Sequence, residues 1–358
     1  MQCSRRAYIV SVFGKTTGGM VAVALLGVLA LFSACVPEPV AELFAAGDLR
    51  PPAIASWGPT GISEVTVFFD ESIAKVLPGC AASPGPAVLS ARLSDDGTGM
   101  VVELDAAQSP GAAYAVSAVV ADAAGNLSSF VLPYWGYNPD PPYVLINELL
   151  TEGSATHPDA LEFFVKEGGE CAGLSFFVGI PGDQDLRFVF PMLRVEAGDF
   201  IVLHLKPQGI DVEINETADK SASGGLDASP GAWDLWYEGE NGALSGANGA
   251  LSLCTSPNGA ILDAVVYSER TIDSDTKYGG FGTASLRDRV TSMVTAGVWN
   301  AGDPPRPEAC APSGASTSTR TICRSSSSAD NDAGADWHIV PTKGASLGTP
   351  NSDLVHSP

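Results

Sequence analysis

Basic residues are scarce in this sequence. Nineteen Lys and Arg stand against 41 Asp and Glu among 358 residues, which gives a formal net charge of −22. A field of this sign repels phosphate backbones, so the composition disfavours nucleic acid as a partner. The acidic residues are dispersed rather than gathered in blocks, which indicates a solvated surface more than a dedicated cation-binding role.

The motifs of common enzymes are also missing. The four histidines show no HxxxH or HxxE spacing, so we expect no zinc site at His157, His204, His338 or His356. There is no G-x-S-x-G elbow and no P-loop, and we expect no cofactor, no metal and no catalytic residue. The segment Asp330–Asp336 is similar to part of a calcium loop but lacks the glutamate that an EF-hand supplies at its twelfth position.

Two acidic residues lie within apolar stretches that we expect to be strands. Glu148 falls in residues 144–150 and Glu162 in residues 160–166. Two carboxylates that flank one glycosidic bond permit its hydrolysis, so a paired-carboxylate site is one interpretation. We favour the other interpretation, in which one glutamate caps a turn and its counterpart faces solvent.

Long stretches suited to helices, with apolar residues at 3.6-residue spacing, are missing after residue 40. The 39 Gly and 26 Pro, together with only 17% charged residues, are typical of a turn-rich β protein. We therefore predict an all-β fold.

Long apolar runs are missing except near the N-terminus. Residues 20–32 form an uncharged run that is too short to span a membrane, and Arg5, Arg6 and Lys15 precede it, which is typical of a signal peptide. The run ends in Ser33-Ala34-Cys35, which resembles the lipobox of bacterial lipoproteins. The resemblance implies a signal peptide over 1–34, lipidation of Cys35 and a tether over 35–50. An ordinary signal peptide with a chance cysteine is the alternative.

Residues 51–138 show short alternating strands separated by turn residues. The segments that carry this pattern are Val65–Glu71, Met100–Leu104, Pro110–Tyr114 and Asp122–Asn126. They resemble the bacterial Ig-like domains of S-layer and other surface proteins, which implies a small β-sandwich acting as a spacer. We expect Asp122 and Asn126 to serve a turn rather than a cation, and we expect residues 139–142 to form a stiff proline linker.

Residues 143–353 resemble a lamin tail domain, an Ig-like β-sandwich. The motifs that carry the resemblance are Ile146-Asn147-Glu148, Leu161-Glu162-Phe163, Ser285-Leu286-Arg287, Asp336-Trp337 and Gly348-Thr349-Pro350-Asn351. The resemblance implies a second sandwich with insertions at 206–250 and 288–329, followed by a tail at 354–358. The expected fold is thus two Ig-like β-sandwich domains in tandem behind a lipoprotein signal peptide.

The 206–250 insertion is polar except for an aromatic segment. Trp233, Trp236 and Tyr237 are the candidate ligand-binding residues, because exposed Trp and Tyr are enriched in interface hot spots. The alternative is that they cover the core of the sandwich. We expect partial docking of Trp233, with Trp236 and Tyr237 more exposed.

The cysteines after Cys35 are candidates for disulfides, since the protein is expected to be exported. Cys310 and Cys323 flank a polar loop, and their pairing would stabilise the fold by about 3 kcal/mol. Cys171 and Cys254 are the next candidates, which leaves Cys80 unpaired.

These features predict a non-enzymatic lipoprotein of the cell envelope, anchored by lipid, with the outer membrane favoured over the inner. Its head would bind a protein or an envelope polymer. The alternatives are an accessory or degenerate module of a secreted hydrolase or nuclease system, and a purely structural envelope component.

Overall fold

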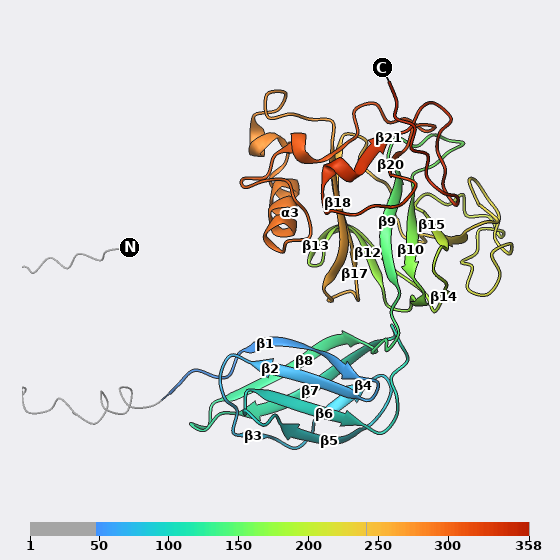
Figure 1. Cartoon of the computed structure of the whole chain (residues 1–358). Coiled ribbons are helices and arrows are strands. Elements are labelled where there is room, and N and C mark those ends of the chain that lie inside the picture. Colours follow the sequence, from blue (N-terminus) through green and yellow to red (C-terminus); the bar gives the residue numbers. More distant parts are fainter. Residues whose placement is uncertain (1–47, 241, 358) are drawn as a thin grey trace, which may run out of the picture. The chain divides into compact units, whose positions relative to one another are not determined.

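The computed structural model describes residues 48–240 and 242–357 (Figure 1). The expected signal peptide, Cys35 and most of the tether lie outside the described residues. The regular secondary structure of the described chain is mostly β-strand, with a single α-helix, α3 (Ala284–Thr295), in that part, so the all-β prediction is confirmed. None of the described helices is both long and apolar enough to cross a membrane.

The first module, residues 51–138, consists of two antiparallel sheets, as Figure 1 shows. The first sheet has the order β1-β2-β6-β5, with bounds Ile54–Gly61, Glu64–Phe69, Gly99–Leu104 and Val88–Leu93. In the second sheet, β7 pairs with β3, β4 and β8, and these strands span Ala113–Ala121, Lys75–Val76, Ala81–Ser83 and Leu127–Trp135.

Apolar side chains at alternating positions along the strands build the core of the first module. In β2, Val65 and Val67 are fully buried and lie opposite Val102 and Met100 of β6. Burying each such side chain contributes about 1.5–3 kcal/mol. Asp122 closes the β7–β8 turn by accepting hydrogen bonds from the backbone N and Nδ2 of Asn126, at 2.8 and 2.7 Å. These two residues therefore serve the turn, as expected from the sequence.

The second module has two large sheets and a short one. The six-stranded sheet has the order β16-β15-β10-β9-β20-β21, with bounds Trp233–Trp236, Phe200–His204, Ala160–Glu167, Tyr143–Leu150, Ile322–Arg324 and Trp337–Ile339. The five-stranded sheet has the order β13-β12-β17-β18-β19, with bounds Asp183–Val189, Ser175–Ile180, Asn248–Cys254, Ile261–Ser268 and Ala311–Pro312. The pair β11 (Gly169–Glu170) and β14 (Arg194–Val195) completes the sheets, and three 3-10 turns span Lys277–Gly280, Pro307–Ala309 and Gly334–Asp336.

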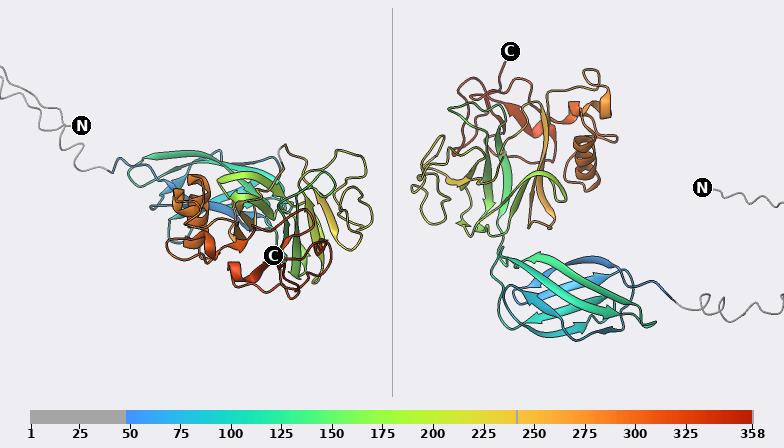
Figure 2. Two further views of the ribbon diagram at one scale, coloured as in Figure 1. Left: turned by 90° about the horizontal axis from the view of Figure 1, so that it is seen from above. Right: turned by 180° about the vertical axis from the view of Figure 1, so that it is seen from behind.

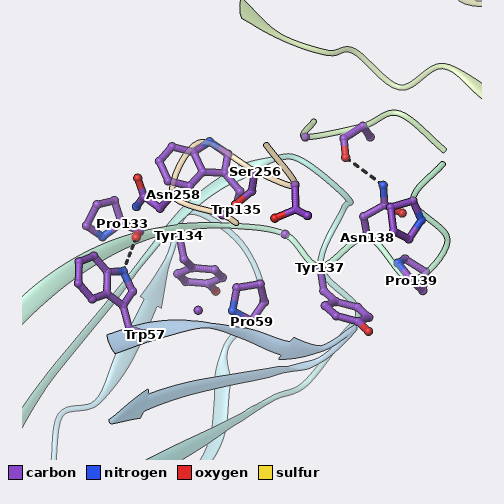
Figure 3. Close-up of a pocket in the computed structure, with 17 residues that line it drawn as sticks. Trp57, Pro59, Pro133, Tyr134, Trp135, Tyr137, Asn138, Pro139, Ser256 and Asn258 are labelled. Carbon is purple, nitrogen blue, oxygen red and sulfur yellow. Dashed lines mark hydrogen bonds between the residues drawn. The ribbon is translucent and has the colours of Figure 1, made fainter. Parts of the chain in front are cut away.

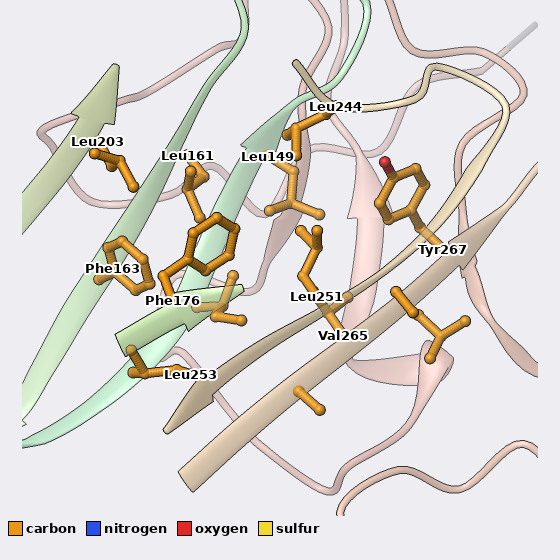
Figure 4. Close-up of a cluster of buried hydrophobic side chains, with 14 of the residues drawn as sticks. Leu149, Leu161, Phe163, Phe176, Leu203, Leu244, Leu251, Leu253, Val265 and Tyr267 are labelled. Carbon is orange, nitrogen blue, oxygen red and sulfur yellow. The ribbon is translucent and has the colours of Figure 1, made fainter. Parts of the chain in front are cut away.

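The core of the second module lies between its two large sheets (Figure 4). Leu161 and Phe163 of β10 meet Phe176 of β12, and the rings of Phe163 and Phe176 pack edge to face with centroids 5.7 Å apart. In the five-stranded sheet, β17 and β18 form an antiparallel hairpin with Leu251 opposite Val265.

Helix α3 was not expected from the sequence. Figures 1 and 2 show it beside the five-stranded sheet, on the side away from β10 and β15. It buries Leu286, Val290 and Met293, and its buried Arg289 forms ion pairs with Asp183 and Asp185 of β13 at 2.8 and 2.7 Å. The apolar residues recur at i, i+4 and i+7, which is helical spacing. Long helical stretches were not expected after residue 40, and this 12-residue helix is the exception within the described chain.

The 206–250 insertion is more structured than expected, because polar side chains organise it. Its β16 runs parallel to β15. Glu216, which is 1% exposed, accepts hydrogen bonds from the backbone N of Ser223 and of Asp234, at 2.8 and 2.7 Å. Asn215 Oδ1 accepts a further bond from the backbone N of Trp236 at 2.7 Å. Buried hydrogen bonds therefore fix this loop together with the apolar contacts that Leu235 and Leu244 make in the main core.

Candidate functional site

The two glutamates of the opening strands lie opposite each other. Glu148 of β9 and Glu162 of β10 are partners in the antiparallel register, and both are completely buried. The expectation that one caps a turn and the other faces solvent is therefore wrong. Burial raises the pKa of both carboxyl groups, and for Glu162 the nearby charge of Glu148 raises the pKa further.

A C-terminal segment, residues 345–351, covers the two carboxyl groups. Glu148 accepts hydrogen bonds from the backbone N and Oγ of Ser346 at 2.9 and 2.7 Å, and also from the hydroxyl of Thr321. Glu162 accepts from the backbone N of Gly348 at 2.6 Å and from Asn147 Nδ2 at 2.7 Å. We call residues 345–351 the strap. It fixes both carboxyl groups within the protein and keeps them from solvent.

Gly348 allows the strap to approach this closely. Its backbone has φ +82°, which favours glycine, and a Cβ added there would lie 2.3 Å from Ser229 Oγ. Asn351 then anchors the end of the strap by donating to the carbonyl oxygens of Asn147 and Arg324, at 3.2 and 3.0 Å. Residues 348–351, one of the motifs noted in the sequence, thus hold the strap over Glu148 and Glu162.

Arg324 forms the other half of this polar network. Its guanidinium group is fully buried, contacts Asp263 at 3.1 Å and Asp330 at 2.8 Å, and lies 4.7 Å from the centroid of Trp337. Burial raises the pKa of Asp263 to about 7, although Arg324 lowers it. The calcium-loop-like segment 330–336 therefore surrounds a guanidinium cation supplied by the chain itself.

The aromatic segment of the insertion is docked. Trp236 is its most buried aromatic residue, although it was expected to be more exposed than Trp233. Trp236 is 3% exposed and stacks on His204 with ring centroids 3.9 Å apart, and His204 Nε2 lies 2.7 Å from buried Asp234. Trp233 and Tyr237 are half-buried against the main core. The expectation that Trp236 is exposed is wrong, and the observation that made it a binding candidate is removed.

Neither expected disulfide is present. Cys80, Cys171, Cys254, Cys310 and Cys323 are all free thiols in the described chain. Cys310 precedes β19 of the five-stranded sheet, whereas Cys323 lies in β20 of the six-stranded sheet. Burial raises the pKa of Cys171, Cys254 and Cys310 to about 12, which disfavours the thiolate form that acts as a nucleophile. These residues are therefore packed as part of the protein interior.

A different set of aromatic residues lines a pocket (Figure 3). The pocket has a volume of about 410 Å³ within the compact unit Pro51–Pro358. Its aromatic side chains come from β1 and from the end of β8 and the residues after it, and they are Trp57, Tyr134, Trp135 and Tyr137. We call it the junction pocket, because residues 255–259 of the β17–β18 turn and residues 172–173 complete its lining.

The junction pocket is uncharged in a strongly acidic protein. None of the described residues that line it is acidic or basic. Trp57 Nε1 donates to the carbonyl oxygen of Pro133 at 2.7 Å, which fixes the indole while 38% of the residue stays exposed. The side chains of Ser256 and Asn258 form no hydrogen bond within the described chain and remain accessible. The pocket thus combines aromatic faces with neutral hydrogen-bonding groups.

Sequence reasoning missed this pocket, although one signal was visible. Tyr134-Trp135-Gly136-Tyr137 directly precedes residues 139–142, which the sequence predicts to be a stiff linker. The linker is held in place, because Asn138 Nδ2 donates to the carbonyl oxygen of Glu170 at 2.6 Å and Asp140 pairs with Arg194 at 2.8 Å. The aromatic residues that precede it are therefore fixed as well and can line a pocket.

Comparison with known proteins identifies relatives of part of the chain. A protein of Treponema pallidum (strain Nichols), printed as "Uncharacterized protein", is 30% identical over 148 residues, which is 41% of this chain and 37% of that relative. The chain thus spans little more than a third of the length of that relative.

Solved structures of similar arrangement include the N-terminal part of the bacterial S-layer protein SbsC. That likeness has 18% identity and a TM-score of 0.25, and it covers 41% of this chain and 39% of the other. Domains 1–6 of surface layer protein SbsC give 11% identity and a TM-score of 0.24 over 70% of this chain and 44% of the other. Scores this low carry no conclusion about function.

A family model matches a longer part of the chain than the Treponema pallidum relative does, namely more than half of it. A model described as "TP_1001_2nd: protein second domain" matches residues 142–339, which include β9 through β21 and both buried glutamates. The chain therefore belongs to the family of this TP_1001 second domain.

Proposed function

We propose that this protein is a non-enzymatic envelope lipoprotein, anchored by lipid at Cys35, that binds a neutral saccharide segment of an envelope polymer in the junction pocket. The observation that carries the binding proposal is the uncharged, aromatic lining of that pocket. Small-molecule sites commonly combine aromatic walls with a few polar groups that orient the ligand.

The chemistry of the lining favours a sugar over a charged ligand. A pocket without lining charges cannot neutralise an anion or a cation that leaves water, and desolvation of an unpaired charge is costly. Sugar rings offer apolar faces for Trp57 and Tyr137 and hydroxyl groups for Ser256 and Asn258. These side chains lie on the rim of the same pocket.

A proline-rich peptide is the alternative ligand, because aromatic grooves also receive such peptides in the polyproline II conformation. Trp57 Nε1 cannot donate to a peptide carbonyl, since it is already bonded to the carbonyl oxygen of Pro133. Other donors of the lining, among them Trp135, Ser256 and Asn258, can serve either ligand.

The buried polar network supports a non-enzymatic role. Glu148 and Glu162 are sealed by the strap, so no substrate reaches them in this conformation. Within the described chain the ring of His157 has a single partner, Asp227, and no hydroxyl group lies within hydrogen-bonding distance of it. A charge-relay arrangement of the kind used by hydrolases is therefore not assembled at this histidine.

Binding of neutral oligosaccharides to the full chain in detergent micelles tests the proposal. Chains of glucose and of N-acetylglucosamine serve as probes in isothermal titration calorimetry. Trp57→Ala and Tyr137→Ala should each weaken binding by about tenfold or more, as expected for aromatic anchors. Tyr278→Ala is the matched control, because Tyr278 is 44% exposed and does not line the pocket. Absence of binding to every probe, or equal loss in the control, would overturn the saccharide assignment.

A further inference from the structure

A second pocket lies where four loops of the second module meet. It has a volume of about 540 Å³. The residues that line it come from the end of β9 and the β9–β10 loop, from 227–230 of the insertion, from 318–319 before β20, and from Lys343, Ala345 and Leu347. We call it the loop pocket. A volume of this size accommodates a small molecule.

Opposite charges line the loop pocket without pairing with each other. Asp227 Oδ1 lies 2.8 Å from His157 Nδ1, and Asp227 Oδ2 has no hydrogen-bond partner in the described chain. Lys343 lines the same pocket, and its exposed ammonium group forms no ion pair with any described residue. Buried polar groups are usually hydrogen-bonded. The cavity therefore combines a buried carboxylate oxygen that lacks a donor with a solvated ammonium group that is free to bind an anion.

The backbone holds both charged residues in an unusual conformation. Asp227 has φ +62° and Lys343 has φ +65°. Residues other than glycine rarely occupy this left-handed region, and lysine gains no local hydrogen bond there as aspartate can. The turn at Lys343 is nevertheless closed by a hydrogen bond from Gly344 N to the carbonyl oxygen of Pro341 at 2.8 Å. Strain of this kind is concentrated at ligand sites, because the surrounding structure maintains it.

Apolar residues complete the loop pocket. Leu150 is 2% exposed in its wall, and Leu347 is anchored against the small core of Ala160, Val202 and Ala232. These side chains lower the polarity of the pocket wall, which strengthens the attraction of the partly buried Asp227 for a cationic group. They also leave room for a short aliphatic side chain.

We propose that the loop pocket binds a small zwitterion of the amino-acid class, a free amino acid or a short peptide with both ends free. The ligand ammonium contacts the Asp227 carboxylate, whose Oδ2 lacks a donor in the described chain. The ligand carboxylate contacts Lys343. A zwitterion pairs with both charges at once, whereas a singly charged ligand pairs with only one of them. This site is separate from the junction pocket, so it stands independently of saccharide binding.

Calorimetric titration of the full chain in detergent micelles tests the zwitterion site. The probes are alanine, Ala-Ala and Ala-Ala-Ala with free ends, together with the N-acetylated and the C-amidated form of each. At least one free-ended probe should bind, and blocking either end should weaken binding by about tenfold or more. Equal binding of blocked and free probes, or no binding of any probe at about 10 mM, overturns the proposal.

Two variants test which residue binds the ammonium end of the ligand and which binds the carboxylate end. Asp227→Asn should abolish the preference for a free N-terminus, and Lys343→Gln the preference for a free C-terminus. Asp273→Asn and Lys277→Gln remove the same charges from exposed residues outside the loop pocket and should change neither preference. If a control variant lowers affinity as strongly as its pocket counterpart, the effect is one of overall charge and the proposed site is wrong. Asparagine tolerates φ near +60°, so Asp227→Asn preserves the turn.

Discussion

Glu148 and Glu162 face each other across β9 and β10, completely buried, and both accept hydrogen bonds from the same strap. Because burial raises the pKa of each, the folded protein retains protons on this pair at pH values where the unfolded chain has lost them. A proton on one of the two carboxyl groups removes the repulsion between their charges.

The first prediction concerns pH. With raised pKa values, the pair contributes stability that is complete below the unfolded pKa of about 4.3 and is lost as pH rises through the folded values. The free energy of unfolding should therefore fall from mildly acidic toward alkaline pH. Glu162→Gln should flatten this slope, and Asn147 Oδ1, which lacks a partner, is available to accept from the new amide. Denaturant midpoints measured across pH test this.

Glu167→Gln is the matched control for the pH experiment. Glu167 ends the same strand but is exposed, so its replacement should leave the slope unchanged. An identical slope in the Glu162→Gln protein would mean that the pair does not titrate differently in the two states. Below about pH 4 the trend should reverse, because Arg289 lowers the pKa of Asp183 and Asp185.

A second prediction separates the two tryptophan sites. Trp236→Ala removes a buried indole that stacks on His204 and should destabilise the protein by about 3–5 kcal/mol. Trp57→Ala removes a partly exposed indole and should shift the melting temperature much less while weakening saccharide binding. A Trp236→Ala protein that melts like the wild type would contradict the docked arrangement.

Arg324 provides a third prediction. Arg324→Met leaves Asp263 buried without its cation, and breaking such a pair costs about 3–5 kcal/mol. Arg324→Lys should rescue little of the stability, since lysine cannot reproduce the contacts of a planar guanidinium with Asp263, Asp330 and the carbonyl oxygen of Ile146. Thermal unfolding compares these variants with Arg287→Met, whose arginine pairs with its exposed neighbour Asp288. Equal melting temperatures for the Arg324 and Arg287 variants would refute this role.

Thiol labelling tests the absence of disulfides. Cys80 is the half-buried member of the five described thiols, and the other four are buried. A membrane-impermeant maleimide should modify Cys80 in the native protein, and it should modify all five after denaturation without reductant. Peptide mass spectrometry reads out each site. Protection of Cys310 and Cys323 that persists in denaturant until reductant is added would restore the expected disulfide.

A final prediction concerns the membrane anchor. Replacement of Cys35 by Ser should move the protein from the detergent phase to the aqueous phase in Triton X-114 partitioning. More than one acyl chain is needed for stable anchoring, and a lipobox cysteine carries several. Unchanged partitioning of the Cys35→Ser protein would exclude lipidation as the anchor.

Hydrophobic alternation in the sequence was sufficient to locate the strands that build both cores. Val65 and Val67 lie where the alternation predicts, and β9 and β10 cover the apolar stretches expected at 144–150 and 160–166. Helix α3 was not predicted, although Leu286, Val290 and Met293 are at helical spacing. A short amphipathic stripe is difficult to distinguish from loop residues in a Gly-rich sequence.

The burial of Glu148 and Glu162 beneath the strap was not predictable from local sequence patterns. Glu148 is held by Thr321 and Ser346, which are 173 and 198 residues away in the chain. Periodicity describes which side of a strand a residue occupies, but it does not reveal that a distant segment seals that side. The same reasoning explains Trp236, whose burial depends on His204 of a neighbouring strand.

The strap has a consequence for how the protein reaches its folded state. Residues 346 and 348 provide donors to carboxyl groups on strands that begin some two hundred residues earlier. During synthesis the two strands are made long before the strap, so both carboxyl groups stay open to water until residues 346–348 are available. The burial of this pair is therefore completed late, by a contact of long sequence separation, whatever the order in which the strands themselves form.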